Sequence, residues 1–187
     1  MSSVVLAGSS SGTLTIAAPA AAGTNTLTLP ASTSTIATTA DIACPAFSVY
    51  ASATQSIADN SATKLAFNTE IFDTNSNFDS TTNYRFTPTV AGYYQINAQV
   101  QSGGSSTTEV WFCNIHLNGT HVLSGSNGQT KFATVGACSN VAGLVYMNGS
   151  SDYVEAYVYQ RSGGGALSTQ AGSQATSNFS GVLIRKA

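Results

Sequence analysis

The chain has 187 residues, carries a formal net charge of −2, and is only 7 % charged, against roughly a quarter in ordinary soluble domains. Its six lysines and arginines are scattered, so no basic patch can neutralise a row of phosphates, and nucleic acid is excluded as a partner. No window approaches the roughly 18 apolar residues of a membrane span, and the first residues lack the features of a secretory signal. We therefore expect one well-buried domain with an appendage, made and used in soluble form without a membrane partner.

Residues 1–44 contain a repeated motif of low complexity. The segment Ser11-Gly-Thr-Leu-Thr-Ile-Ala-Ala-Pro19 is echoed by Gly23-Thr-Asn-Thr-Leu-Thr-Leu-Pro30 and, more weakly, by Ser34-Thr-Ile36. Each copy alternates hydroxyl and aliphatic side chains and stops at proline or small residues, which predicts short half-buried strands. Because so few large aliphatic side chains cannot offset the entropy of ordering, we expect an extended arm that another molecule holds.

From Pro45 on, aromatic residues appear, and residues 45–187 are predicted to form the globular domain. Short candidate strands are separated by turns rich in Gly, Asn and Ser, without helical periodicity, which indicates an all-β sandwich or jelly roll. The candidate strands are 46–51, 62–67, 92–101, 107–117, 120–123, 130–137, 142–147, 153–160 and 177–185. Asn118-Gly119 predicts a two-residue hairpin turn, because this pair accepts the positive backbone angles that such a turn needs.

The stretch from Tyr84 to Val100 organises the predicted domain. From Gly92 onward, apolar and polar residues alternate, as in a strand with two different faces. Pro88 fixes a backbone angle, and Gly92 permits conformations closed to other residues, so a tight corner is expected before the strand.

The aromatic spacing around this stretch resembles the signature of the globular head of complement component one-q, whose fold is shared with the tumour necrosis factor superfamily. The residues that carry the resemblance are Phe67, Asp73, Phe78, Phe86, Gly92, Tyr94 and Ile96. The resemblance spans Pro45 to Ala187 and implies a ten-stranded jelly roll that assembles as a tight trimer. It specifies no ligand, because a fold does not fix a function.

The strand expected over 153–160 also favours an oligomer. Its residues Val154, Ala156 and Val158 can face the core, which sends four other side chains outward: Tyr153, Glu155, Tyr157 and Tyr159. Aligned tyrosines suit a homotrimer contact, because each combines an apolar body with a polar tip. Singly exposed tyrosines are the alternative.

Residues able to support catalysis or bind a metal are sparse. His116 and His121 should lie opposite each other across the hairpin, either as a metal-sharing pair or, as we favour, as a polar pair near a loop. Glu70, Asp73 and Asp79 lie in an Asn-rich segment expected to be a loop, where turn capping is favoured over calcium binding. We therefore predict no catalytic residue, no metal and no cofactor.

The three cysteines, Cys44, Cys113 and Cys138, lack metal-type spacing. Their odd number favours buried free thiols, with a bridge between Cys113 and Cys138 as the alternative.

The paired Thr-Leu-Thr segments of the arm resemble segments of tailed-bacteriophage structural proteins, particularly tail fibres and other virion appendages. Joined to a trimeric jelly-roll head, they predict a non-enzymatic virion protein on the outer surface of the particle, synthesised in the host cytoplasm. We favour a capsid decoration, or cement, protein whose arm binds the major capsid protein or other virion proteins. The arm residues expected to make this contact are Leu14, Ile16, Leu27, Leu29 and Ile36.

The alternative is a small tail fibre or spike tip that binds a glycan or protein on the host cell surface. The candidate contact residues lie in or near three uncharged loops, at 102–106, 124–128 and 163–176. They are Trp111, Ser124, Asn127, Ser162 and Gln170.

Overall fold

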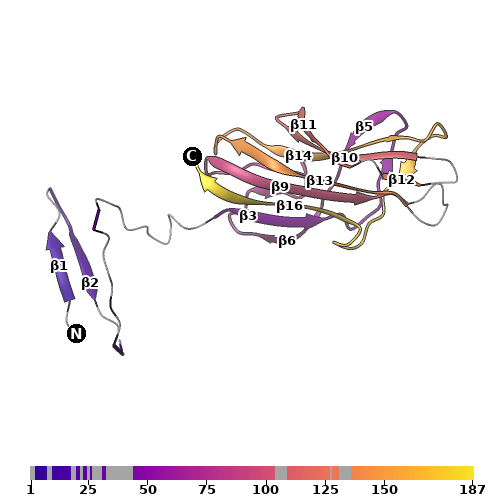
Figure 1. Ribbon diagram of the computed structural model, residues 1–187. Helices are drawn as coiled ribbons and strands as arrows, with labels where there is room; N and C mark the ends of the chain where they lie inside the picture. Colours follow the sequence, from indigo (N-terminus) through magenta and orange to yellow (C-terminus); the bar gives the residue numbers. More distant parts are fainter. Residues whose placement is uncertain are drawn as a thin grey trace. The chain divides into compact units, whose positions relative to one another are not determined.

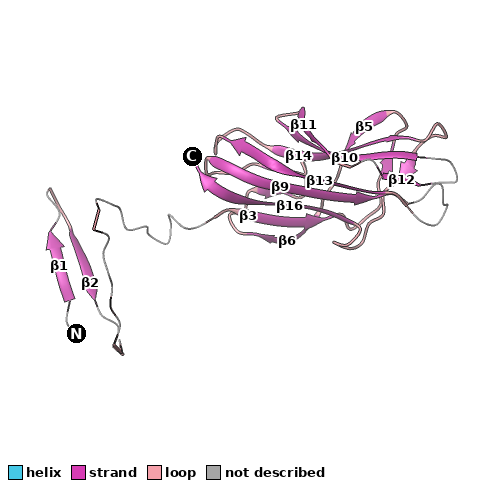
Figure 2. Ribbon diagram, viewed as in Figure 1, coloured by secondary structure: helices cyan, strands magenta, loops and turns pink. Residues whose placement is uncertain are grey.

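The computed structural model describes residues 3–7, 10–17, 20–21, 23–24, 26, 31–32, 44–103, 109–126, 128–130 and 136–187. These residues form strands and loops without a helix, and hence without a helical membrane span (Figure 2). The chain divides into two compact units, Met1–Ile42 and Ala43–Ala187. The prediction of an all-β fold is confirmed.

The N-terminal unit contains an antiparallel pair of strands, β1 (Ser3–Ala7) and β2 (Thr13–Ala17). Strand β2 coincides with the first Thr-Leu-Thr copy, whereas β1 was not predicted. The β1 segment contains the β-branched residues Val4 and Val5, which favour strand pairing. Of the expected arm contacts, Ile16 is 49 % exposed. Leu27, Leu29, Ile36 and the side chain of Leu14 lie outside the described residues.

The globular unit is built from two antiparallel sheets (Figure 1). The five-stranded sheet has the order β13 (Cys138–Met147), β9 (Gly92–Gln101), β16 (Ser177–Lys186), β3 (Ala46–Tyr50), β6 (Thr69–Asp73). The six-stranded sheet has the order β11 (Thr120–Ser124), β10 (Glu109–Leu117), β14 (Val154–Arg161), β8 (Arg85–Phe86), β7 (Phe78–Asp79), with β12 (Gly128–Thr130) also on β10. The short strands β4 (Ser56–Ile57) and β15 (Leu167–Ser168) pair with each other, and β5 (Ser61–Lys64) lies beside β14.

Most predicted strands are present, with small differences at their ends. Strand β9 has the predicted bounds. Residues Thr69–Asp73, expected within a loop, instead form β6, whose backbone pairs with β3. The strand expected over 130–137 is described as a strand only at Thr130, and Gly136 and Ala137 are not in a strand.

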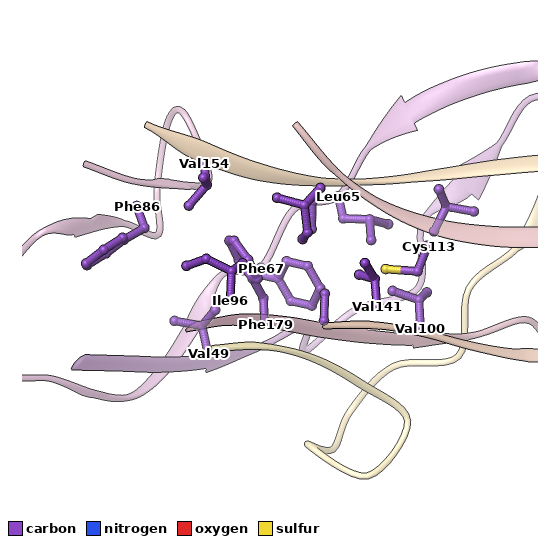
Figure 3. Packing of buried hydrophobic residues seen from close by; sticks show 14 of the residues in the cluster. Val49, Leu65, Phe67, Phe86, Ile96, Val100, Cys113, Val141, Val154 and Phe179 are labelled. Carbon is purple, nitrogen blue, oxygen red and sulfur yellow. The ribbon is translucent and has the colours of Figure 1, made fainter. Parts of the chain in front are cut away.

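The core lies between the two sheets and is rich in phenylalanine (Figure 3). The Phe47 ring stacks on Phe86, with 4.3 Å between centroids, and meets the edge of Phe179 at 5.0 Å. Val154, Ala156 and Val158 are fully buried, as their alternation predicted. Aromatic contacts of this kind add about 0.5–1.5 kcal/mol each to the burial of apolar area.

The expected contact residue Trp111 belongs to this core. Its side chain is 0 % exposed, and its indole N–H donates to the Val100 carbonyl oxygen at 3.0 Å. Trp111 shares the inward face of β10 with Cys113 and Ile115, because alternate residues of a strand point to the same side. The prediction that Trp111 is a contact residue for a host-surface ligand is therefore wrong.

The corner before β9 is held by Tyr94, whose hydroxyl donates to the Val90 carbonyl oxygen at 2.7 Å. The reason for Gly92 differs from the expected one, since this residue does not adopt a positive φ angle. A Cβ atom at this position would collide with the Arg185 carbonyl oxygen of the neighbouring strand β16. Glycine is needed here for the close approach of two backbones.

Candidate functional site

The outer face of the five-stranded sheet carries a group of exposed apolar side chains, which we call the tyrosine–leucine patch. It consists of Tyr93, Leu144, Tyr146 and Ile184, which are 48, 61, 47 and 60 % exposed. The two tyrosines face each other across β9 and β13, with ring centroids 5.5 Å apart. The patch lines a shallow hollow that the C-terminal residues also border. Contiguous exposed apolar side chains of this size are typical of interaction surfaces.

The outer face of the six-stranded sheet contains a second hollow, of about 450 Å³, which we call the histidine hollow. In Figure 1, β11 and β5 lie on the outer side of β10 and β14. Ala62 of β5 forms part of the wall. The other lining residues come from β10, β11 and β14; they are Phe112, Asn114, His116, His121, Ser124 and Tyr159.

The hairpin between β10 and β11 positions the two histidines as predicted. Asn118 and Gly119 have φ angles of 52° and 78°, and His116 is paired with His121 in the strand register. The imidazole rings stack with centroids 5.3 Å apart, and the His116 ring also stacks on Tyr157 at 3.9 Å. Burial, followed by the neighbouring His121, lowers the pKa of His116 below its usual value of 6.5. His116 is therefore mostly uncharged at neutral pH.

The described residues contain no cluster of three histidine, cysteine or carboxylate side chains able to hold a metal ion. Ser124 Oγ lies 3.0 Å from His121 Nε2, but that nitrogen is also 3.1 Å from the Leu123 carbonyl oxygen. Within the described part of the chain, no carboxylate forms a hydrogen bond or an ion pair with the His121 ring. The pair thus lacks the orienting third group of a catalytic nucleophile–base set.

The carboxylates of the β6–β8 region cap turns, as favoured from the sequence. Asp79 accepts hydrogen bonds from the backbone N–H groups of Thr82, Thr81 and Asn83, which hold the pKa of its carboxyl well below the usual range. Asp73 accepts from the Phe78 N–H at 2.6 Å. Oxygens used in this way stabilise the loop rather than a calcium ion.

The four side chains predicted to point outward from residues 153–160 have partners within their own chain. Glu155 is buried and lies 3.1 Å from the Lys64 Nζ atom, while the Tyr159 hydroxyl donates to Asn60 at 2.6 Å. Tyr153 stacks against the Arg85 guanidinium at 4.2 Å, and Tyr157 stacks on His116. Their use as a trimer contact stays a prediction.

The expected loop contacts are not gathered into one site. Ser124 lines the histidine hollow, whereas Asn127 lies outside the described residues. The Ser162 N–H donates to Asp59 at 2.9 Å, and the Gln170 N–H donates to the Gln101 carbonyl oxygen at 2.7 Å. Ser162 and Gln170 belong to the segment between β14 and β16 and do not line the hollow.

The cysteines differ in burial. Cys113 and Cys138 are free thiols, so the alternative of a bridge between them is wrong. Cys113 is buried as expected, and burial raises the pKa of its thiol, whereas Cys44 and Cys138 are exposed. Cys113 lies on the inward face of β10 and Cys138 at the start of β13 in the opposite sheet.

No protein-family model matches the chain, and no curated protein matches it significantly. Solved structures do match. Murine APRIL has a TM-score of 0.52 at 10 % identity, covering 76 % of this chain and 100 % of its own. Eiger TNF from S. frugiperda has a TM-score of 0.50 at 11 % identity, covering 77 % of this chain and 93 % of its own. The PRD1 vertex protein P5 has a TM-score of 0.53 at 18 % identity, covering 75 % of this chain and 97 % of its own.

The globular unit has a tumour necrosis factor-like jelly-roll fold. Identities this low establish the fold alone. The function of this chain therefore has to be inferred from its own surfaces, because a fold does not fix a function.

Proposed function

We propose that the chain is a non-enzymatic structural protein of a tailed-bacteriophage particle, a trimeric decoration protein attached to the outer capsid by its N-terminal arm. The observation that carries the proposal is the pair of strands β1 and β2. Val5 and Leu6 are 56 and 51 % exposed there, and Ile16 is 49 % exposed. A two-stranded ladder is marginally stable in water by itself, so we expect another protein to cover these apolar side chains and stabilise the two strands.

The arm suits attachment to another protein through its backbone. A strand added to an exposed sheet edge gains hydrogen bonds without demanding particular side chains. The segment Thr13–Ala17, with its alternating hydroxyl and aliphatic residues, already has the extended conformation that such pairing needs. Three arms on one trimer would multiply the attachment through effective concentration. The major capsid protein is the partner that we propose.

The tyrosine–leucine patch is the surface that we propose for contact between the three copies. Leu144 and Ile184 are about 60 % exposed, and covering large apolar side chains is the main driving force of stable association. The outward side chains of β14 are a weaker candidate, because Glu155 is already buried against Lys64.

A decoration role is compatible with the similarity to the PRD1 vertex protein P5, whose name places a jelly roll of this kind at the vertex of a virus particle. The described residues contain no cluster able to hold a metal ion, and the Ser124–His121 pair among them lacks an orienting carboxylate, which supports a proposal of binding rather than catalysis.

Deleting residues 1–40 tests the attachment. The truncated protein should remain a folded trimer and should no longer bind phage particles stripped of it. Ser11→Asp, which changes an exposed position in the turn between β1 and β2, is the matched control and should bind normally. Leu6→Asp together with Ile16→Asp should weaken binding strongly. Full occupancy of particles by the truncated protein would contradict arm-mediated attachment.

A small tail fibre or spike tip is the second candidate. The histidine hollow favours it, because aromatic and uncharged polar side chains surround a space of about 450 Å³, within the range of about 300–1,000 Å³ typical of ligand pockets. The position and copy number of the chain on the particle distinguish the two candidates.

A further inference from the structure

Asn114 has an unusual environment in the histidine hollow. Its side chain is 7 % exposed, yet no hydrogen bond to its carboxamide is formed by the described residues. The carboxamide is not sealed from water, because it opens on the hollow; the fully buried side-chain atom without a hydrogen-bond partner among the described residues is Gln160 Oε1. Because Asn114 lines the hollow, its free donors and acceptor are available to a molecule bound there.

The described lining of the hollow carries no charged side chain. Lys64 and Glu155 form an ion pair with each other, so their charges are already compensated. His116 has a pKa lowered by burial and by His121, so it adds no fixed positive charge at neutral pH. A phosphate, carboxylate or ammonium group would lose its hydration without a compensating charge. The hollow therefore suits an uncharged ligand.

The hollow combines ring surfaces with small polar groups. Phe112 and Tyr159 lie side by side across β10 and β14, with ring centroids 6.5 Å apart. Asn114 follows on the same face of β10, and Ser124 and His121 lie across from it on β11. A ligand with an apolar face and many hydroxyl groups can contact both kinds of surface at once.

We propose that the histidine hollow is a binding site for a neutral saccharide. One face of a sugar ring would pack on Phe112 or Tyr159, and the hydroxyl groups would hydrogen-bond to Asn114 and to the Ser124 and His121 edge. The inference goes beyond the proposed function and does not depend on it, because a decoration protein and a fibre tip can each present such a site.

Saturation-transfer NMR on the full-length protein tests the site, with maltotriose, chitotriose, lactose and sialyllactose as probes. At least one neutral saccharide should bind, and sialyllactose should bind no more tightly than lactose. Binding of none of these saccharides would overturn the proposal.

Asn114→Leu is the decisive variant. It should reduce saccharide affinity at least tenfold while leaving the Tm unchanged, because the amide gives up no hydrogen bond to the described residues and leucine of similar volume leaves no cavity. Tyr159→Leu should also reduce binding, and Tyr50→Leu in β3 of the opposite sheet, outside both the hollow and the tyrosine–leucine patch, is the control that should not. Unchanged affinity in Asn114→Leu, or a large fall in its Tm, would overturn the proposal. Dissociation of the oligomer by Tyr159→Leu would do so as well, by assigning the hollow to a subunit contact.

Discussion

Replacing Lys64 by Met tests whether β5 closes over β14 within one chain. Lys64 Nζ lies 3.1 Å from Glu155 Oε1, and the Tyr157 hydroxyl lies 3.3 Å from the other carboxylate oxygen. The Glu155 side chain is 6 % exposed and that of Lys64 is 34 % exposed. Lys64→Met would leave the carboxylate buried with the tyrosine hydroxyl as its remaining partner, which is costly in a medium of low polarity.

The magnitude follows from these exposures. Removing one partner of a fully buried ion pair costs about 3–5 kcal/mol. Because a third of the Lys64 side chain contacts water, the pair is partly screened, and we expect about 2–3 kcal/mol. At roughly 3 °C per kcal/mol for a domain of this size, the Tm should fall by about 6–9 °C.

The assay is thermal unfolding of Lys64→Met, Glu155→Leu and the double variant, at equal protein concentration so that association contributes equally. The double variant should recover most of the lost stability, because an apolar pair of similar volume replaces the charges. A fall of less than 1 °C in Lys64→Met, or a double variant no more stable than Lys64→Met, would refute the reasoning. Either of these results would favour a contact of Glu155 with another subunit instead.

Three further outcomes are expected. Because the pKa of His116 is lowered in the folded state, the unfolded chain binds more protons, so the free energy of unfolding should decrease as the pH falls below about 6.5. Urea unfolding of His116→Gln should show a smaller decrease. An unchanged dependence of the free energy of unfolding on pH would contradict the lowered pKa of His116. Gly92→Ala should lower the free energy of unfolding by about 1–3 kcal/mol in urea unfolding, because its Cβ would collide with the Arg185 carbonyl oxygen. A urea midpoint equal to that of the wild type would mean that β9 and β16 can move apart at little energetic cost. Leu144→Asp should yield monomers in sedimentation analysis while Tyr157→Glu remains a trimer, and the reverse result would move the interface to β14.

The parts of the fold that the sequence predicted correctly are those determined by neighbouring residues in the chain. Asn118-Gly119 accepts positive φ angles, so the hairpin and the facing histidines followed from two residues. The regular alternation from Gly92 to Gln101 likewise defined both faces of β9. Where local preference and tertiary structure agree, a sequence is informative.

The errors arise where tertiary pairing decides. Strand β6 is a strand because its backbone pairs with β3, although its flanks are rich in Asn and Thr. Trp111 was placed at the surface for its size and chemistry, whereas the alternation along β10 puts it in the core with Cys113.

The surface features, too, could not be predicted where they depend on the pairing of strands. Tyr93 lies on the exposed face of β9, among polar residues, and only the pairing of β9 with β13 brings it beside Tyr146. The alternation of Leu144 and Tyr146 was the signal in the sequence that could have indicated the patch. The position of the Asn114 amide in the histidine hollow had no sequence signal, because the hollow depends on packing between strands that are distant in the chain.

Cryo-electron microscopy of the phage particle on which we propose that this chain is displayed tests the central claim most directly. A decoration role predicts many trimers spread over the icosahedral shell, each joined through its tyrosine–leucine patches, with residues 1–44 laid across neighbouring capsid subunits. A few copies confined to the tail would contradict that role and would make the chain a fibre or spike component.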